Sequence, residues 1–280
     1  MPTTKTPLRY PGGKSSLYPL VKDILFESSL GGCNYVEPFA GGAGLALKLL
    51  LSGDVDTIHL NDIDPAIYAF WHSVLYRTEE LCQLISHAIL DVEEWRRQQR
   101  IVQKRDASDL LVLGFATFYA NRTSVSGILH GGLIGGIRQS GKYKMSARYN
   151  PRTAVEKITK IAEYRDRIKV TNEDAVCIIS ASMSAPEKTF YNIDPPYVGR
   201  GQDLYTNSFR EADHRALCQV ITTCPSPWIV TYDDDPLVRE LYSEYRCVNP
   251  RIYYSIGRRR HERELMYFSE NCQLPARTEG

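Results

Sequence analysis

The chain has 280 residues, of which 43% are hydrophobic and 24% charged, and its formal net charge is +1. This length supports one sizeable core with a smaller appendage, and the composition is that of an ordinary globular protein. No apolar run approaches the roughly 18–20 residues that span a bilayer, and the first residues lack the apolar segment of a secretory signal. We therefore expect a cytoplasmic protein with no membrane partner. Histidines and cysteines are scattered without zinc-site spacing, which predicts no metal site.

The N-terminal part of the chain alternates between helices and strands. Residues 16–30 predict an apolar helix, and Asn34–Glu37 predicts a short buried strand that runs through a glycine-rich turn into another helix. Residues 57–60 predict a second strand. Pro65 then opens a further helix, because proline is favoured in the first helical turn.

The same alternation returns in the C-terminal half. The predicted strands there are Ile168–Thr171, Thr189–Ile193 and residues 228–232, and the predicted helices are Glu211–Thr222 and residues 236–242. Residues 246–254 and Glu264–Phe268 alternate in polarity and predict a terminal β-hairpin. Repeated strand–helix units predict an α/β fold with a mostly parallel sheet covered on both faces.

A different composition separates these two regions. Residues 78–120 have a helical pattern, whereas residues 121–151 are rich in glycine and basic side chains. We predict that residues 78–151 form an inserted, mainly helical domain, and that residues 1–77 and 152–280 form the α/β core. No Asp or Glu occurs from residue 121 to residue 155. Such a basic patch on a near-neutral protein suits a phosphate backbone, although a solvated basic loop would have the same composition.

The first candidate motif is the segment VEPFAGGAG at residues 36–44, where a strand enters a glycine-rich turn and then a helix. Glycines let the backbone approach a ligand closely and leave the amides at the helix start available to it. A tight strand–helix connection without a ligand is the alternative. The candidate cofactor-binding residues in this segment are Glu37, Pro38, Phe39, Gly41, Gly42 and Gly44.

The second candidate motif is the acidic segment that ends the next strand. Asp62 follows Gly44 by eighteen residues, which is the spacing at which a carboxylate accepts hydrogen bonds from the ribose of a nucleotide cofactor. Ile63 is counted with this cofactor site. Asp64 precedes Pro65, and we predict that it caps the following helix.

The third and most specific motif is Asp194-Pro195-Pro196-Tyr197, directly after a predicted strand. An amino group on an aromatic ring is a poor nucleophile, because its lone pair is delocalised into the ring. The Asp194 carboxylate and the Pro195 carbonyl would accept its two hydrogens and stabilise the positive charge that develops on methylation. Pro196 stiffens the backbone, and Tyr197 offers a face on which an extruded base can stack. These four residues are the predicted catalytic residues, although alone the tetrapeptide could be an ordinary turn.

Together these motifs resemble the Dam-like family of adenine-specific DNA methyltransferases, in the family's order and over nearly the whole chain. The segment LRYPGGK at residues 8–14 is similar to the family's N-terminal cofactor motif. Residues 37–44 are similar to its Pro-Phe-x-Gly-x-Gly loop, residues 61–64 to its ribose-binding acid and residues 194–197 to its catalytic loop. Asn121-Arg122 followed by Gly127 is similar to part of its DNA-recognition insert.

The resemblance implies a Rossmann-like methyltransferase core with a small inserted DNA-recognition domain. It also implies methyl transfer from S-adenosylmethionine, leaving S-adenosylhomocysteine, to N6 of a flipped adenine in a short duplex DNA site. Tyr10 would pack on the cofactor, Lys14 would lie near its carboxylate, and Asp174 would bind its adenine unless it caps a helix instead. The further cofactor-binding candidates by resemblance are Gly12, Gly13 and Asp194.

The insert and the segment before the cofactor motif would contact DNA. Arginine and lysine can bind guanine edges, while most other contacts go to phosphates. The candidates are Arg9, Asn121, Arg122, His130, Arg138, Lys142 and Lys144. The run RRRHER at residues 258–263 would straddle the DNA backbone or form a solvated loop.

The recognition sequence is not expected to be GATC. Family members that read GATC usually have aromatic residues after Asn-Arg and an arginine just beyond the glycine. The segment TSVSGILH at residues 123–130 has neither. We therefore predict a short target that contains adenine, without naming it.

Two other functions remain open from the sequence. One is methylation of a different planar amine, in RNA or in a protein amide. The other is a catalytically silent DNA-binding protein that keeps the fold. We expect a monomer, and the sequence leaves open whether a cognate restriction nuclease accompanies it.

Overall fold

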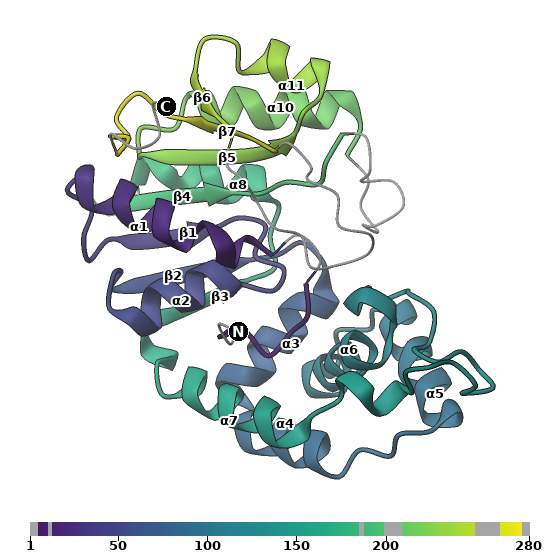
Figure 1. Cartoon of the computed structure of the whole chain (residues 1–280). Helices are drawn as coiled ribbons and strands as arrows, with labels where there is room; N and C mark the ends of the chain where they lie inside the picture. Colours follow the sequence, from purple (N-terminus) through teal and green to yellow (C-terminus); the bar gives the residue numbers. More distant parts are fainter. Residues whose placement is uncertain (1–4, 11–12, 185–187, 199–208, 250–263, 276–280) are drawn as a thin grey trace. The chain divides into compact units, whose positions relative to one another are not determined.

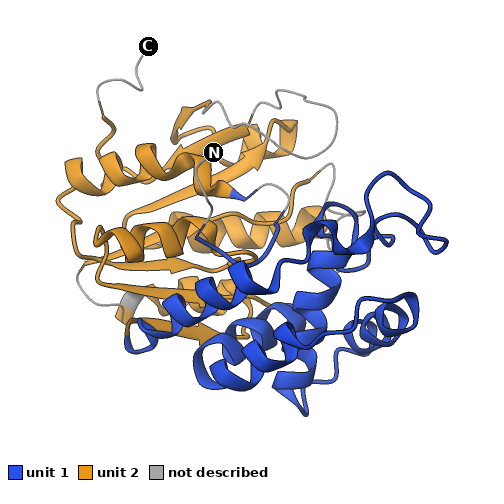
Figure 2. Cartoon of the chain, turned by 60° about the horizontal axis from the view of Figure 1, so that its bottom comes forward, with its two compact units in different colours: residues 1–13, 64–166 blue, residues 14–63, 167–280 orange. Residues whose placement is uncertain are grey.

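The computed structural model describes residues 5–10, 13–184, 188–198, 209–249 and 264–275. The chain divides into two compact units (Figures 1 and 2). Unit 1 comprises Met1–Gly13 and Asp64–Asp166, and unit 2 comprises Lys14–Ile63 and Arg167–Gly280. None of the helices in the described ranges is long and apolar enough to cross a membrane.

Unit 2 is built on a seven-stranded sheet with the order β3-β2-β1-β4-β5-β7-β6. Strands β3, β2, β1, β4 and β5 pair in parallel, whereas β7 is antiparallel to both of its neighbours. The predicted α/β fold with a mostly parallel sheet is therefore confirmed. The strands are β1 (Asn34–Glu37), β2 (Thr57–Asn61), β3 (Ile168–Thr171), β4 (Thr189–Ile193), β5 (Trp228–Asp233), β6 (Arg246–Val248) and β7 (Glu264–Phe268).

The C-terminal strands pair as an antiparallel hairpin, as predicted, but β6 is shorter than the predicted strand. It ends at Val248, and residues 250–263, which include the basic run 258–263, lie outside the described residues. Strand β7 lies between β5 and β6, and its first residue pairs with the last residue of β5. The start of β7 is thereby placed beside the carboxyl end of a parallel strand, where ligand sites of α/β sheets usually form.

Helices cover both faces of this sheet (Figure 1). A buried apolar cluster joins α8, α10 and α11 to one face, through side chains such as Ile178, Leu217 and Val238. Helices α1 and α2 pack together over the other face. The helical segments are η1 (Lys14–Leu17), α1 (Tyr18–Glu27), α2 (Gly44–Ser52), α8 (Ala175–Ser180), η5 (Ala181–Ser184), α10 (Glu211–Thr222) and α11 (Pro236–Leu241).

Alternation along the strands decides which side chains share a face. In β1, β4, β5 and β7 the residues of the apolar cluster alternate with residues that point to the opposite face. Polar side chains at the carboxyl ends of β1, β4 and β5 and at the start of β7 lie on that opposite face. They are Glu37, Asn192, Thr231 and Glu264.

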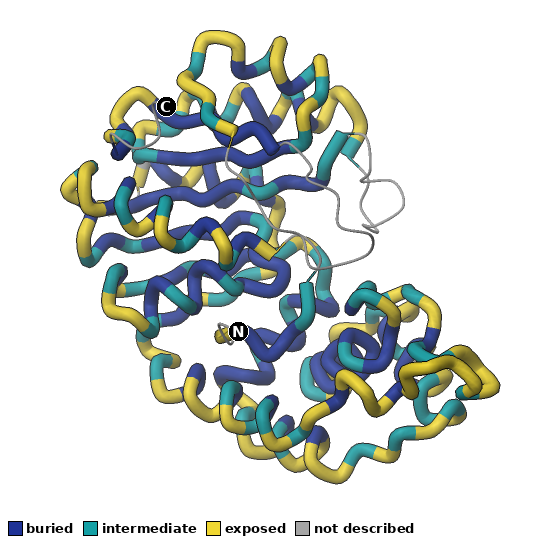
Figure 3. The backbone as a smooth tube through the Cα atoms, in the orientation of Figure 1, coloured by how far each residue is buried: buried dark blue, intermediate teal, exposed yellow. Residues whose placement is uncertain are grey.

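In the described residues, the regular secondary structure of unit 1 is helical, and one isolated bridge joins Ser124 and Leu133. Helix α6 is its centre and is buried along most of its length (Figure 3). A Cβ on Gly114 of α6 would lie 2.6 Å from the Ala69 carbonyl oxygen, so only glycine lets α6 approach α3 this closely. The helical segments are α3 (Pro65–Tyr76), α4 (Thr78–Ser86), α5 (Val92–Lys104), α6 (Leu110–Thr123), η2 (Val125–Gly127), η3 (Met145–Arg148) and α7 (Pro151–Ala162).

Unit 1 is wider than the insert expected at residues 78–151. It begins at Asp64, ends at Asp166 and also takes in residues 1–13. The reason is helix packing: α3 lies along α6, and α7 packs against α4 and α3, so the flanking helices share the core of unit 1. Which unit binds cofactor and which binds DNA remains a prediction.

A tight turn after α6 holds the N-terminal segment of unit 1. The Asn121 side chain accepts a hydrogen bond from Arg9 N (2.8 Å) and donates to the carbonyl oxygens of Arg9 (2.7 Å) and Gly127 (2.8 Å). Gly127 has a φ of 79°, and a Cβ there would lie 2.5 Å from the Arg9 carbonyl oxygen. The turn and residues 5–10 therefore fit together only when position 127 is glycine.

Replacing Gly127 with alanine is expected to destabilise the protein by about 2 kcal/mol or more. The new methyl group would clash with the Arg9 backbone, and alanine rarely adopts the positive φ of this position. Urea unfolding would measure the loss. Gly132 is the matched control, since a Cβ there would have no heavy atom within 4 Å. Gly132→Ala should change stability by no more than about 0.5 kcal/mol. Equal effects of the two substitutions would contradict the close approach of Arg9.

Candidate active site

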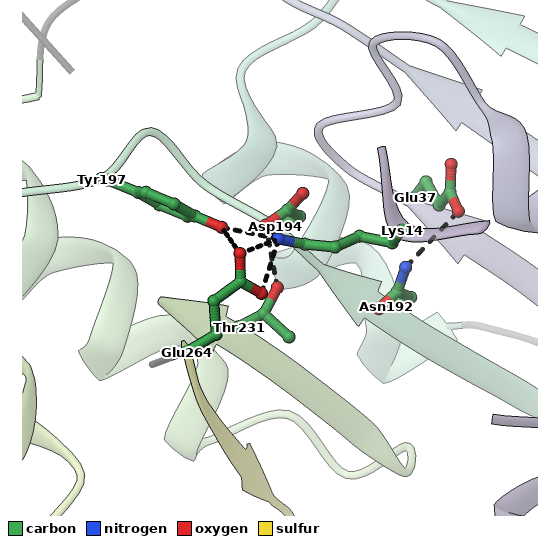
Figure 4. A network of polar contacts seen from close by, with 7 residues as sticks. All are labelled: Lys14, Glu37, Asn192, Asp194, Tyr197, Thr231 and Glu264. Carbon is green, nitrogen blue, oxygen red and sulfur yellow. Dashed lines mark hydrogen bonds and ion pairs between the residues drawn. The ribbon is translucent and has the colours of Figure 1, made fainter. Parts of the chain in front are cut away.

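Lys14 is the centre of a polar network in unit 2 (Figure 4). Its side chain is only 5% exposed, and its ammonium group contacts carboxylates from two strand ends. Lys14 Nζ lies 3.1 Å from Asp194 Oδ1, and 3.0 and 2.9 Å from the two carboxylate oxygens of Glu264. A buried cation of this kind is stable only because acidic partners surround it.

Asp194 is anchored through one carboxylate oxygen. Oδ1 accepts a hydrogen bond from Thr231 Oγ1 on β5 (2.8 Å) and contacts Lys14, whereas neither of these contacts uses Oδ2. The side chain is 28% exposed, so it is held by the protein yet reachable from outside. The arrangement leaves a fixed acceptor at the start of the Pro-Pro segment.

Tyr197 is half-buried, and its hydroxyl group belongs to the same network. It accepts a hydrogen bond from Lys14 Nζ (2.6 Å) and donates one to Glu264 Oε1 (2.5 Å). One residue later, Val198 N donates to Asp233 Oδ1 at the end of β5 (3.3 Å). Side chains of β5 and β7 thus hold the segment from residue 194 to residue 198 at several points.

In this network, burial and charge pairing have opposite effects on the pKa values of the ionisable groups. Burial alone would lower the pKa of Lys14, but the carboxylates of Asp194 and Glu264 outweigh it, so the pKa is raised and the group is a firm cation. Burial raises the pKa of Glu264, and the nearby Lys14 cation opposes that rise while Asp194 adds to it. The cluster holds two carboxylates for one cation and is therefore sensitive to the loss of Lys14.

Glu37 forms a second, less satisfied carboxyl site on the same face of the sheet. It is 5% exposed, and its Oε1 accepts long hydrogen bonds from Tyr35 Oη (3.3 Å) and Asn192 Nδ2 (3.4 Å), while the Ala46 backbone also hydrogen-bonds to the carboxyl group. Burial raises the pKa of Glu37 to about 8, against the hydrogen bonds from Asn192 and Tyr35. Beside it, Asn192 Oδ1 is buried without a hydrogen-bond partner. A carboxyl group with a raised pKa beside an unsatisfied carbonyl oxygen suits a ligand that brings a positively charged N–H group.

The raised pKa of Glu37 predicts a pH-dependent stability. A carboxyl group with a folded pKa of about 8 and an ordinary value of 4.5 binds a proton on folding, so its contribution is present at low pH and is lost as pH rises through 8. We therefore compare the free energy of unfolding of ligand-free Glu37→Gln with that of the protein without the substitution. As pH rises from 5.5 to 8.5, this difference should shift in favour of Glu37→Gln by on the order of a few kcal/mol. Urea unfolding at both pH values measures this difference, with exposed Glu244→Gln as control. Parallel pH profiles for Glu37→Gln and the unchanged protein would exclude a buried, neutral Glu37.

The glycine-rich turn between β1 and α2 is tied to the neighbouring strand ends. Gly41 N donates to Asp62 Oδ2 (2.9 Å), and both Gly41 and Ala43 adopt positive φ values of 46° and 47°. The fully buried Asn61 side chain donates to the carbonyl oxygens of Pro38 and Glu173, each at 2.9 Å. The ends of β1, β2 and β3 are thereby held as one edge, and the exposed Ile63 follows directly after Asp62.

Two further predicted acids are helix caps. Asp64 accepts from Ala66 N (2.9 Å) at the start of α3, which confirms its predicted role. Asp174 accepts from Val176 N (2.7 Å) at the start of α8 and is exposed, which matches the alternative reading of that residue. A carboxylate already engaged in a cap retains one oxygen for other contacts, so binding of a cofactor by Asp174 stays a prediction.

The predicted cofactor residues do not all belong to this site. Lys14, Asp194 and Tyr197, the last of which is a predicted catalytic residue, come together, and Asp62 accepts a hydrogen bond from Gly41. Tyr10 and Gly13 belong to unit 1, where Gly13 N donates to the Tyr10 carbonyl oxygen (3.2 Å), and Gly12 lies outside the described residues. The remaining predicted residues line the turn or loop described above: Pro38, Phe39, Gly42, Gly44, Pro195 and Pro196.

Sequence reasoning did not single out Thr231, Asn192, Asn61 or Glu264. Thr231 and Glu264 reach the site because β5 lies between β4 and β7 in the sheet, which local sequence does not reveal. One signal was available: a glutamate opens the otherwise apolar strand ELMYF, where a buried charge requires a partner.

Three arginines of unit 1 lie close together, and none of them forms a salt bridge within the residues that the structure describes. Burial lowers the pKa of Arg122 to about 10, and the neighbouring cations of Arg9 and Arg148 lower it further. The pKa of Arg9 is also lowered, mainly by burial and to a smaller extent by the positive charge of Arg148. Arg122 Nε is buried without a hydrogen-bond partner, and its guanidinium carbon lies 5.9 Å from the centroid of the Phe118 ring. Such an uncompensated cluster is suited to an anion, and Arg148 was not among the predicted DNA contacts.

The other predicted DNA contacts of unit 1 differ in exposure. Arg138, Lys142 and Lys144 are exposed, whereas the side chain of Asn121 is buried and engaged with backbone groups. His130 lines a pocket of about 410 Å³ together with α5 side chains that include Trp95 and Arg100. Within the described part of the chain, no group of three or more His, Cys, Asp and Glu residues could hold a metal ion.

Similar solved structures share low sequence identity with this chain. A protein of Pyrococcus horikoshii, provisionally described as an RNA methyltransferase, is 12% identical at a TM-score of 0.42, with 94% of this chain and 84% of that chain covered. A protein of Thermoplasma acidophilum is 9% identical at a TM-score of 0.36, with coverage of 94% and 89%. A Haemophilus influenzae protein, provisionally described as a methylase, is 11% identical at a TM-score of 0.33, with coverage of 90% and 89%.

The sequence comparisons are more decisive. A comparison of the chain with curated proteins found no match. Residues 10–256, in contrast, match the family described as D12 class N6 adenine-specific DNA methyltransferase, which confirms the predicted resemblance. Because this match spans most of the 280 residues, from the segment around Tyr10 through the Asp-Pro-Pro-Tyr loop, the chain belongs to the D12 class N6 adenine-specific DNA methyltransferase family.

Proposed function

We propose that this protein is a site-specific DNA methyltransferase that transfers a methyl group from S-adenosylmethionine to N6 of an adenine flipped out of duplex DNA. The observation that carries the proposal is the geometry of Asp194. Its Oδ1 is fixed by Lys14 and Thr231, while Oδ2 takes part in neither contact, and the side chain is partly exposed next to two prolines. This is the acceptor that an aromatic amine needs in order to become a nucleophile.

The residues of unit 2 fit S-adenosylmethionine. Asn192 Oδ1 is buried without a donor beside the Glu37 carboxyl group, whose pKa is raised, and the ammonium group of the cofactor's amino acid part would give both a charged N–H partner. The half-buried Asp62 at the end of β2 would accept from ribose hydroxyls, with the exposed Ile63 beside it. Bound there, the cofactor supplies an electrophilic methyl group on a positively charged sulfur.

The residues of the catalytic loop act on the target amine. Asp194 Oδ2 and the Pro195 carbonyl oxygen would accept the two amino hydrogens, which favours a tetrahedral nitrogen and stabilises its developing positive charge. The Tyr197 ring would stack on the extruded adenine, at an unstacking cost of roughly a few kcal/mol for the DNA. Holding both groups before the substrate arrives removes the cost of ordering them during transfer.

The cationic cluster in unit 1 supports a nucleic acid as substrate. Burial and the neighbouring cations lower the pKa values of Arg9 and Arg122, and no carboxylate is among the causes of either shift, so a phosphate group would satisfy this cluster. The exposed lysines and arginine at positions 138, 142 and 144 extend this positive charge. A protein amide substrate would not need such a cluster, and family membership favours DNA over RNA.

Single-molecule sequencing of DNA from a methylation-free host that expresses the chain tests this proposal. The expected result is N6-methyladenine at one short sequence other than GATC. A parallel assay offers the purified protein tritium-labelled S-adenosylmethionine with duplex DNA, RNA and protein. If the tritium label appears only in RNA or only in protein, that molecule and not DNA is the substrate. If the protein binds DNA but transfers label to no acceptor, it is a catalytically silent protein.

A further inference from the structure

Glu264 is a buried acid at the edge of the site that lies beyond the residues matched by the family, which end at 256. It opens β7, where it pairs with Asp233 of β5, and it is 1% exposed. A glutamate in this position has lost nearly all its water, so it persists only where its contacts replace that hydration.

Both oxygens of Glu264 are engaged with residues of the proposed active site. Oε1 accepts from Tyr197 Oη (2.5 Å) and from Lys14 Nζ (3.0 Å), and Oε2 accepts from the same ammonium group (2.9 Å). Lys14 in turn contacts Asp194 Oδ1 at 3.1 Å. One side chain therefore touches the stacking residue directly and the catalytic carboxylate through a single cation (Figure 4).

We propose that Glu264 is a positioning residue for methyl transfer, which sets the ring of Tyr197 and, through Lys14, the orientation of Asp194. This inference rests on the proposed function. Glu264 contacts neither the substrate nor the cofactor in this proposal. It acts by restricting two side chains that do, and its contribution should therefore appear in the rate of transfer rather than in substrate binding.

Glu264 and Lys14 make different contacts with the Tyr197 hydroxyl. Glu264 accepts its proton, whereas Lys14 is itself a donor and cannot accept it. Without Glu264, the Lys14 ammonium would keep one carboxylate, that of Asp194, and would draw closer to it. Both changes would misalign a proton acceptor and a stacking face, and small misplacements of such groups are enough to slow a reaction.

The test is a double-mutant cycle of Glu264→Gln and Tyr197→Phe, assayed by steady-state methyl transfer to DNA and by urea unfolding. Glu264→Gln keeps the size of the side chain but removes its charge. We expect kcat to fall about tenfold or more, while KM for cofactor and for DNA changes by less than about threefold. Tyr197→Phe should lower kcat in the unchanged protein but have little further effect in the Glu264→Gln protein, because the hydroxyl acts through Glu264.

Glu270→Gln is the matched control, since the same chemical change falls on an exposed glutamate shortly after β7, and its kcat should stay within about twofold. Additive effects on kcat in the cycle, or an unchanged kcat in Glu264→Gln, would overturn the inference while leaving the proposed function standing. If the protein without any substitution transfers no methyl group to DNA, both the inference and the proposed function are overturned. Should Glu264→Gln fail to fold, Tyr197→Phe alone decides: an unaltered kcat would contradict the positioning role, and a lowered kcat at constant KM would support it.

Discussion

Asp194→Asn is expected to lower kcat for methyl transfer by about a thousandfold or more, because it replaces the anionic acceptor of the target amine with a neutral amide. The amide retains the shape of the side chain and an oxygen for Thr231 and Lys14. Cofactor affinity, measured by calorimetry, should therefore change by less than about threefold. Asp194→Ala should lose transfer to a similar extent. Steady-state tritium transfer to duplex DNA measures both.

The matched control is Asp235→Asn, which makes the same change at the N-cap of α11, where asparagine caps equally well. Its kcat should remain within about twofold of the unchanged protein. If Asp194→Asn transfers methyl groups as fast as the Asp235→Asn control, Asp194 has no role in the reaction. Loss of cofactor binding together with transfer would instead assign Asp194 mainly to the cofactor.

Lys14→Met is expected to destabilise the protein by about 3–5 kcal/mol, because it leaves two carboxylates without their shared cation, one of them fully buried. Methionine fills a similar volume, so the loss reports charge rather than packing. The deficit should depend on pH. Burial already raises the pKa of Glu264 and the Lys14 cation opposes the rise, so removing Lys14 raises that pKa further. A raised carboxyl pKa favours the folded state at low pH and loses that contribution as pH rises, so the deficit should grow from about pH 5 to pH 8.

A second substitution separates charge from packing in this result. The double variant Lys14→Met, Glu264→Gln no longer buries an unpaired carboxylate and should recover about half or more of the lost stability. Urea unfolding at pH 5 and pH 8 measures all three variants. A deficit that is independent of pH, or a double variant less stable than Lys14→Met alone, would contradict the charge balance described for this network.

Local patterns in the sequence were sufficient to predict most of the strands and the glycine-rich turn. Strand β1 forms at Asn34–Glu37 and β4 at Thr189–Ile193, as their apolar runs and flanking turn residues predicted. These features depend on neighbours in the chain: the alternation of side chains, the stiffness of proline and the capping preference of Asp64. The family match then follows from motifs that are each continuous in sequence.

The composition of the site depended on the tertiary structure. Lys14 and Glu264 are separated by 250 positions, and they meet because β7 inserts between β5 and β6 while η1 covers the same face of the sheet. Likewise, Arg148 joins Arg9 and Arg122 only once α6, η3 and the N-terminal segment pack together. Periodicity tells which face of an element is buried, but not which distant element covers it. That choice follows from the packing of the whole core and the pairing of buried charges, to which every strand and helix of a unit contributes.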